Sequence, residues 1–172
     1  MIATFAARPR LSLAVLAFVI GLAAIVAAWG FELIGGYLPC ELCLAQRNPY
    51  YVGLPLALIA ILVEVFGGPR WLFRVLMLLV AVCFVYGAGL GVYQAGAQWG
   101  FWQGPTACSG NGNLIPAKAS DLLNSLDKVK VISCTDVTWR MFGLSFAGWN
   151  AVVSAAVALL AVAAAALRRR PA

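Results

Sequence analysis

Four long stretches with almost no charge constrain this chain more than any other feature. The stretches are Leu11–Phe31, Pro49–Phe66, Val75–Tyr93 and Leu144–Leu167, and only the second contains a charge, Glu64. Each is long enough for a helix to cross a bilayer, which takes about 17–25 residues. Backbone groups find no water in lipid, and the stretches lack the polar alternation of barrel strands. We therefore expect four transmembrane helices.

The composition agrees with an all-α membrane protein, a four-helix bundle formed by one domain spanning residues 1–172. The chain is 63% hydrophobic and carries 12 Lys and Arg and 6 Asp and Glu. Its first apolar stretch is longer than the roughly 7–15 residues of a secretory signal core, so we expect it to be retained as a span. The net charge of +6 does not predict nucleic-acid binding, because no soluble domain carries a basic stripe with interleaved aromatics. The expected partner surface is a lipid bilayer.

The positions of the basic residues predict the orientation in the membrane. Seven of them fall in three short segments: Arg8 and Arg10, Arg70 and Arg74, and Arg168, Arg169 and Arg170. Short segments rich in Lys and Arg stay in the cytoplasm. We therefore expect both termini in the cytoplasm of a bacterial-type inner membrane, with periplasmic loops at about 32–48 and 94–143. Glu64 is then expected at the cytoplasmic interface.

Four of the five cysteines fall in the two outer loops. Cys40 and Cys43 form a Cys-x-x-Cys in the short loop, and Cys108 and Cys134 lie in the long loop. The outer side is oxidising, so disulfides persist there. A Cys-x-x-Cys beside a helix start restrains little chain, and its bond is typically exchangeable. This pattern favours disulfide exchange, whereas Cys83, in the middle of the third span, is expected to be an inert packing residue.

Two alternatives remain at this point. Both pairs could be static disulfides, and a bond between Cys108 and Cys134 would contribute about 3–4 kcal/mol through loop closure. Four cysteines could also bind zinc, although Cys108 and Cys134 do not form the second Cys-x-x-Cys of a usual zinc site. A c-type haem is excluded, because Leu44 stands where its histidine ligand would follow the second cysteine.

The long loop combines flexible and amphipathic segments. Gly104–Pro105 and the run Ser109–Asn113 are turn and loop signals that flank Cys108. Ser120 opens a stretch with an apolar face, formed by Leu122, Leu123, Leu126 and Val129. It predicts a short amphipathic helix that lies in the membrane interface or packs on its own loop. In the third span, Gly87 and Gly91 have the small-x-x-x-small spacing of close helix packing.

Two segments resemble the disulfide bond formation protein B (DsbB) family. One is the run from Leu38 to Tyr51, which contains Cys40-Glu41-Leu42-Cys43 and Arg47; the other runs from Cys134 to Asn150. The likeness covers nearly the whole chain, including four spans and the two outer cysteine pairs. It implies an enzyme that reoxidises a soluble periplasmic thiol oxidoreductase of the DsbA type and passes the electrons to membrane quinone, either ubiquinone or menaquinone. The role of this family in keeping the periplasm oxidising is established.

The resemblance also implies a role for each site residue. Cys108 is the sulfur attacked by the partner, Cys134 is its companion, and Cys40 exchanges with this loop pair. Cys43 is the quinone-facing thiolate, and Arg47 matches the family arginine associated with quinone. Some members carry an acid just before this arginine, where this chain has Gln46.

The spacing of Arg47 from Cys43 fits that role. If the segment is helical, Arg47 lies one turn on, about 6 Å along the axis, on the same face. A guanidinium there would stabilise both a thiolate and a negative charge on a quinone oxygen. Two starts of the second span are open. Asn48 could cap a helix with Pro49 in its first turn, leaving Cys-x-x-Cys in a separate turn, or the helix could begin near Pro39 and bend at Pro49.

Two other functions remain as alternatives. A vitamin K epoxide reductase-like protein also combines four helices, quinone chemistry and two cysteine pairs. In that family the Cys-x-x-Cys belongs to the last helix, and Leu144–Leu167 contains no cysteine. A non-catalytic membrane protein stabilised by disulfides or zinc is the other alternative. Metal analysis and a titration of the outer thiols with quinone present would separate it from the enzymes.

Overall fold

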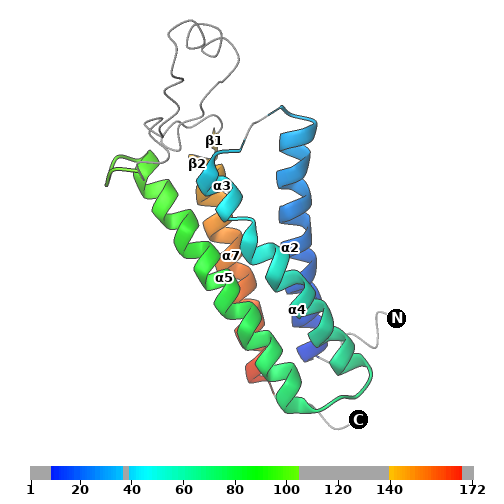
Figure 1. The fold of residues 1–172 in the computed structure, drawn as a ribbon. Coiled ribbons are helices and arrows are strands. Elements are labelled where there is room, and N and C mark those ends of the chain that lie inside the picture. Colours follow the sequence, from blue (N-terminus) through cyan, green and yellow to red (C-terminus); the bar gives the residue numbers. More distant parts are fainter. Residues whose placement is uncertain (1–8, 37–38, 105–139, 168–172) are drawn as a thin grey trace, which may run out of the picture.

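The computed structural model describes residues 9–36, 39–104 and 140–167. Four long helices form a bundle (Figure 1), and a short helix and a two-stranded hairpin complete the described part of the chain. The helices are α2 (Pro9–Leu33), α3 (Glu41–Ala45), α4 (Asn48–Val65), α5 (Arg70–Gln98) and α7 (Phe146–Ala166), and the strands are β1 (Arg140–Met141) and β2 (Leu144–Ser145). Four helical segments of this described part, one of them joining α3 to α4, are long and apolar enough to cross a membrane. The predicted four-span fold is confirmed.

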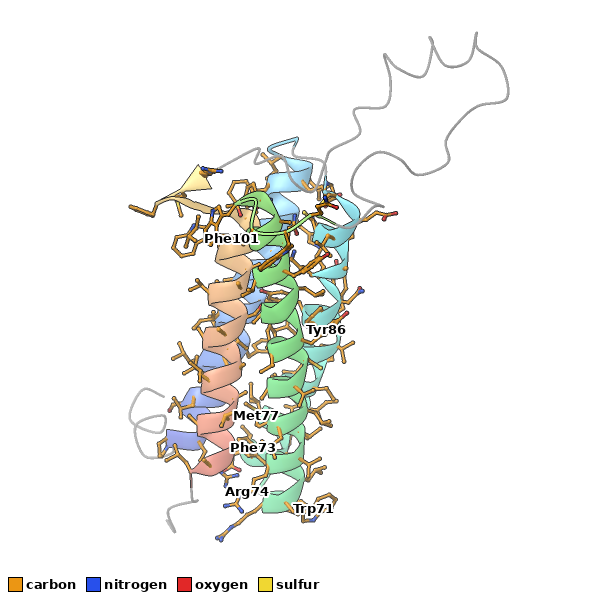
Figure 2. All side chains as sticks on the ribbon, turned by 90° about the vertical axis from the view of Figure 1, so that its left-hand side faces the viewer. Trp71, Phe73, Arg74, Met77, Tyr86 and Phe101 are labelled. Carbon is orange, nitrogen blue, oxygen red and sulfur yellow. The ribbon has the colours of Figure 1, made fainter. Side chains whose placement is uncertain are left out.

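The four helices form a ring in which each packs on two neighbours. α2 contacts α4 and α7, and α5 contacts the same two helices from the other side. The start of α2, the α4–α5 connection and the end of α7 lie together at one end of the bundle (Figure 1). We call it the arginine end, after Arg10, Arg70 and Arg74. The opposite end carries α3 and the hairpin, and we call it the cysteine end, after Cys40 and Cys43 (Figure 1). Figure 2 shows Arg74 near the first end and Phe101 near the second.

Large side chains in the core come mainly from α5. Phe73, Met77, Val80 and Phe84 recur every three or four residues and are fully buried. The other helices meet them with small side chains: Ala14 and Ala17 on α2, Ala57 and Ala60 on α4, and Ala161 and Ala164 on α7. Helices in lipid associate through such close packing, because lipid tails are as apolar as the side chains and give no hydrophobic drive. Many other large apolar side chains on the helices are exposed, as a lipid-covered surface requires; examples are Val26, Ile59, Val82 and Leu159.

The glycines of α5 permit its closest contacts. A Cβ atom at Gly91 would lie 2.8 Å from the backbone nitrogen of Ala151 and 2.9 Å from the carbonyl oxygen of Ala147, both on α7. A Cβ at Gly87 would lie 3.2 Å from Pro49 and 3.4 Å from the Ser154 hydroxyl. At Gly89, nothing lies within 4 Å. The prediction that Gly87 and Gly91 allow close helix packing is confirmed.

The third span is longer than predicted at both ends. α5 begins at Arg70 rather than Val75 and ends at Gln98 rather than Tyr93. The extra turns are helical because they pack against the bundle, and Gln94 is buried there. A prediction based on apolar runs stops at the first polar side chain. The expectation that residue 94 begins the long outer loop is therefore wrong.

The fourth helix begins two residues later than predicted. Leu144 and Ser145 form β2, which pairs antiparallel with β1 in the register Arg140–Ser145 and Met141–Leu144. Phe142 and Gly143 link the strands with φ angles of 52° and 81°. Positive φ at both turn residues suits the twist of a two-residue hairpin. Ser145 then caps α7, its hydroxyl accepting a hydrogen bond from the Gly148 amide at 3.3 Å.

Glu64 is buried inside the bundle, near the end of α4. Its carboxylate forms an ion pair with Arg10 at 3.6 Å, and both side chains are almost fully buried. The Arg10 guanidinium also lies 4.4 Å from the centre of the Phe73 ring. Glu64 has this partner because α2 begins at Pro9 and brings Arg10 into the bundle, and its depth in the membrane stays a prediction. A paired charge is far less costly to bury than a single one.

The start of the second span follows the first of the two predicted alternatives. α3 ends at Ala45, Gln46 and Arg47 interrupt the helix, and α4 begins at Asn48 with Pro49 in its first turn. The residue at the cap position is Arg47 rather than Asn48. The Cys-x-x-Cys thus lies in a separate helical turn. The amphipathic helix predicted from Ser120 lies outside the described residues.

Candidate active site

Cys40 and Cys43 bracket the first turn of α3. Cys40 is the N-cap residue, and its Sγ accepts a hydrogen bond from the backbone amide of Cys43 at 3.2 Å. The two sulfur atoms lie 2.6 Å apart, with both residues present as free cysteines. Cys40 is buried, with 6% of its surface exposed, and Cys43 is partly buried. The turn therefore holds the two sulfurs in mutual contact at the cysteine end of the bundle.

The two sulfurs are not equivalent. The hydrogen bond with the Cys43 side chain, together with burial, raises the pKa of the Cys40 thiol. A reduced pair that loses one proton therefore places its negative charge on Cys43, with Cys40 as the hydrogen-bonded thiol. The thiolate is the reactive form of cysteine in disulfide exchange. The local geometry thus makes Cys43 the nucleophilic sulfur and Cys40 its protonated neighbour.

Gln94 on α5 reaches both sulfurs. Its Nε2 lies 3.4 Å from the Sγ of Cys40 and 3.4 Å from the Sγ of Cys43. The Gln94 side chain is 2% exposed. Its carbonyl Oε1 accepts a hydrogen bond from the Nε2 of Gln46, the residue that follows α3. The side chains of Gln46 and Gln94 thus link the end of α3 to α5 next to the cysteine sulfurs.

The hydrogen bonds continue into α4 and α7. Asn150 donates from Nδ2 to the Oε1 of Gln46 at 2.7 Å, and Tyr50 donates from its hydroxyl to the Oδ1 of Asn150 at 2.7 Å. The Tyr50 hydroxyl is also 3.2 Å from the hydroxyl of Ser154. Each of these groups has at least one hydrogen-bond partner in the chain, and such partners lower the free-energy cost of burying polar side chains in a membrane bundle. The cysteine pair is therefore backed by a continuous polar network.

Arg47 is bonded to a residue on another helix. Its Nη1 donates to the Oε2 of Glu32, near the end of α2, at 2.5 Å. Helix α3 ends before Arg47, so the regular helical turn expected between Cys43 and Arg47 is interrupted. One turn away on the same two helices, the Trp29 indole donates to the Tyr51 hydroxyl at 3.1 Å.

The family model for disulfide bond formation protein DsbB matches residues 9–164, which is nearly the whole chain. The chain belongs to the DsbB family. No curated protein and no solved structure matches it. Membership of the DsbB family confirms the resemblance seen in the sequence. It makes the chain an oxidoreductase of disulfide bond formation and a multi-pass protein of the inner membrane.

Of the cysteines predicted for a DsbB-type site, the structure brings together Cys40 and Cys43. Cys108 and Cys134 lie outside the described residues, so their roles stay predictions. Cys83 is partly buried on α5. Within residues 9–36, 39–104 and 140–167, no group of three His, Cys, Asp or Glu side chains is placed to hold a metal ion.

Sequence reasoning did not identify two residues that contact this DsbB-type site. Glu32, the partner of Arg47, lies at the end of the first span, and its spacing from other residues does not indicate a functional role. Gln94 was assigned to the outer loop, although it contacts both sulfurs. A signal for Gln94 does exist: it follows Gly87 and Gly91 at helical spacing and so shares their packed face. The only amide of the last span, Asn150, likewise turns out to face the site.

Proposed function

We propose that this chain is a dithiol:quinone oxidoreductase that reoxidises a soluble DsbA-type thiol oxidoreductase and passes the electrons to membrane quinone. The observation that carries the proposal is the contact of the Cys40 and Cys43 sulfurs at one end of a membrane-spanning bundle. Family membership, the unequal sulfurs and the neighbouring arginine support it. Both pairs can then cycle between disulfide and dithiol.

The first half of the proposed reaction moves a disulfide outward. A partner thiolate attacks the Cys108 sulfur of a Cys108–Cys134 disulfide, forming a mixed disulfide and releasing the Cys134 thiolate. The second partner thiol attacks its own sulfur in that bond, leaving an oxidised partner and a reduced loop pair. The loop pair then reduces the Cys40–Cys43 disulfide by the same exchange, entering at Cys40. Each exchange breaks one S–S bond and forms another, so two electrons move inward.

The second half returns Cys40 and Cys43 to the disulfide. A bound quinone supplies the acceptor for two electrons and two protons. The Cys43 thiolate is the donor that must face this acceptor, and Cys40 closes the new S–S bond while losing its proton. The second proton of the quinol comes from water, because the thiolate carries none. Ubiquinone and menaquinone both satisfy this balance. The proposal therefore includes quinone as the electron acceptor without choosing between the two.

The residues beside Arg47 fit a quinone. Trp29 and Glu32 are one turn apart on α2, and they bond to Tyr51 and Arg47, one turn apart at the start of α4. Trp29 and Tyr51 are both about half exposed. This surface combines apolar rings, against which a quinone ring and its tail can pack, with a guanidinium that can bond to a ring oxygen. Arg47 and Cys43 are the residues we assign to quinone binding.

The proposed orientation follows from the two ends of the bundle. The arginine end carries Arg70 and Arg74 at the start of α5, whereas α3 with the cysteine pair lies at the opposite end (Figure 1). The positive-inside rule then places the arginine end in the cytoplasm. Cys40 and Cys43 would face the periplasm, where a soluble partner and the long loop can reach them.

The decisive experiment supplies purified protein with a reduced DsbA-type partner and either quinone. We expect one quinol for each partner disulfide formed, and no quinol from Cys43→Ser. With Cys134→Ser, a mixed disulfide with the partner should accumulate through Cys108. Trapping mainly through Cys134 in the Cys108→Ser variant would reverse these two roles. Protein that binds zinc, or that keeps its disulfides while quinone stays oxidised, would overturn the proposal.

A further inference from the structure

A directional chain of hydrogen bonds ends at the cysteine pair. It runs from Ser154 through Tyr50, Asn150 and Gln46 to Gln94. Its members come from three long helices and the break after α3, and all of them are buried or partly buried. Disulfide exchange alone does not require five polar side chains inside a membrane bundle, where each is costly without partners. The arrangement therefore calls for a function.

Every link in the chain points the same way. Tyr50 donates to Asn150, the Asn150 amide donates to Gln46, and the Gln46 amide donates to Gln94. Because the Tyr50 hydrogen is directed to Asn150, the Tyr50 oxygen is left to accept from the Ser154 hydroxyl. At the far end, the Nε2 of Gln94 has two hydrogens and two sulfurs at equal distance. The chain thus brings a donor to both sulfurs at 3.4 Å, closer than the Gln94 Oε1, which lies 3.9 Å from the Sγ of Cys43.

This direction favours negative charge on the sulfurs. An amide N–H bonds more strongly to a thiolate than to a neutral thiol or a disulfide sulfur. Hydrogen bonds aligned head to tail polarise one another, so each link behind Gln94 strengthens the last one. The benefit applies mainly to the ionised state, and it adds no net charge to the membrane. Arg47 cannot supply the same contact, since its guanidinium is bonded to Glu32.

We propose that Gln94 is a catalytic residue that stabilises the thiolate of the reduced Cys40–Cys43 pair, and that Gln46, Asn150, Tyr50 and Ser154 are positioning residues that orient and polarise its amide. The inference rests on the proposed redox function of this pair. It adds a donor from the third span to a site otherwise built from the first two.

The test measures alkylation of Cys43 in the reduced full-length protein as a function of pH. Iodoacetamide reacts with the thiolate, and fragmentation of the labelled peptide by mass spectrometry separates Cys43 from Cys40. In Gln94→Leu we expect the pH of half-maximal alkylation to rise by about one unit or more, which corresponds to losing one hydrogen bond to a charged group. Gln94→Glu should raise it further, because a carboxylate of the same shape repels the thiolate.

The remaining links should give graded effects. Gln46→Leu should shift the alkylation profile less than Gln94→Leu, and Tyr50→Phe should shift it least, because polarisation weakens with each intervening bond. Gln103→Leu makes the same chemical change at an exposed position and should leave the profile unchanged. A residue with a purely structural role would not produce this order. Thermal unfolding in detergent checks that each variant is folded.

The outcomes separate the two proposals. A folded Gln94→Leu protein with the wild-type alkylation profile overturns the role of Gln94, even if quinone is reduced. If Gln94→Leu fails to fold, Gln46→Leu and Tyr50→Phe decide, and the absence of a graded shift in both overturns the inference. If the profiles shift as expected while wild-type protein reduces no quinone, the proposed acceptor is wrong and the role of Gln94 stands.

Discussion

The Arg47 guanidinium bonds to Glu32, and in the proposed function it also binds the quinone. Replacing it with alanine should damage the quinone half-reaction and spare the exchange with the partner. The KM for quinone should rise and kcat should fall, by about 10- to 150-fold together, as expected for one lost charge-assisted contact. Arg47→Lys should recover part of the loss through charge alone. Stopped-flow exchange between the reduced partner and the loop disulfide should be unchanged in both variants.

Glu32→Gln is the control for this prediction. It keeps a hydrogen-bonding side chain at the end of α2 while releasing the guanidinium from its carboxylate. If Arg47 acts on quinone, Glu32→Gln should retain most of the activity. If both Glu32→Gln and Arg47→Ala lost the same activity, the ion pair would act by stabilising the fold and not by binding quinone. Normal quinone kinetics with slow partner exchange in Arg47→Ala would move Arg47 to the docking surface.

Cys83 is predicted to be an inert packing residue without a redox role. It lies partly buried in the middle part of α5, far along the helix from Gln94. Cys83→Ala should leave turnover close to wild type and cost at most about 1 kcal/mol of stability. Turnover and the unfolding midpoint in detergent measure both quantities. Lost activity at normal protein levels and with quinone still bound would show that the fifth cysteine takes part.

Residue spacing identified the cysteines and Arg47 as candidates, but not the residues that support them. Cys-x-x-Cys and the following arginine are local patterns, so the sequence displays them directly. The contacts of Gln94 with the sulfurs depend on how α5 packs against α3 and α7, and no local pattern encodes that packing. Glu32 was missed for the same reason. Its partner lies 15 positions away, on the other side of a connection.

At the scale of helices, the close contact between α5 and α7 depends on Gly91, which has no side chain. Gly91→Ala should destabilise the bundle by about 1–3 kcal/mol, because the new Cβ would overlap backbone atoms of Ala147 and Ala151. Gly91 lies three residues before Gln94, so the displacement should also slow turnover. Gly89→Ala is the matched control: nothing lies within 4 Å, so alanine should be neutral or slightly stabilising through its helix propensity.

Thermal unfolding of the two glycine variants in the same detergent measures the difference. Equal midpoints would show that α5 and α7 can separate without cost, contrary to the packing described here.

Hydropathy predicted the number and order of the helices and misplaced several ends. A run without charge marks the part of a helix that lipid can surround, as in Val75–Tyr93. The turn from Arg70 packs on the bundle through the buried Phe73, and the turn through Gln98 packs through the buried Gln94; a search for uncharged runs does not detect such contacts. Likewise, Ser145 ends a hairpin and caps α7 through local hydrogen bonds. Pro49 marked the start of α4 because proline favours a first helical turn.

At the scale of the whole molecule, the proposed orientation can be tested with a membrane-impermeant thiol reagent. On reduced, intact spheroplasts it should label Cys40, Cys43, Cys108 and Cys134. Labelling of Cys40 should be slower than that of Cys43, because Cys40 is buried whereas Cys43 is only partly buried. Mass spectrometry of the labelled peptides gives the pattern. Labelling that needs rupture of the membrane would contradict the orientation and the proposed function with it.

The two ion pairs between α2 and α4 impose a rule on how this half of the molecule assembles. Each helix has an arginine at or beside its start and a glutamate near its end: Arg10 and Glu32 for α2, Arg47 and Glu64 for α4. This order opposes the helix dipole, so each residue depends on the neighbouring helix for its stabilisation. A parallel alignment would bring like charges together, and a slipped one would separate the paired charges. The two ion pairs therefore favour one antiparallel register of α2 and α4, and this register fixes where the cysteine turn sits along the bundle.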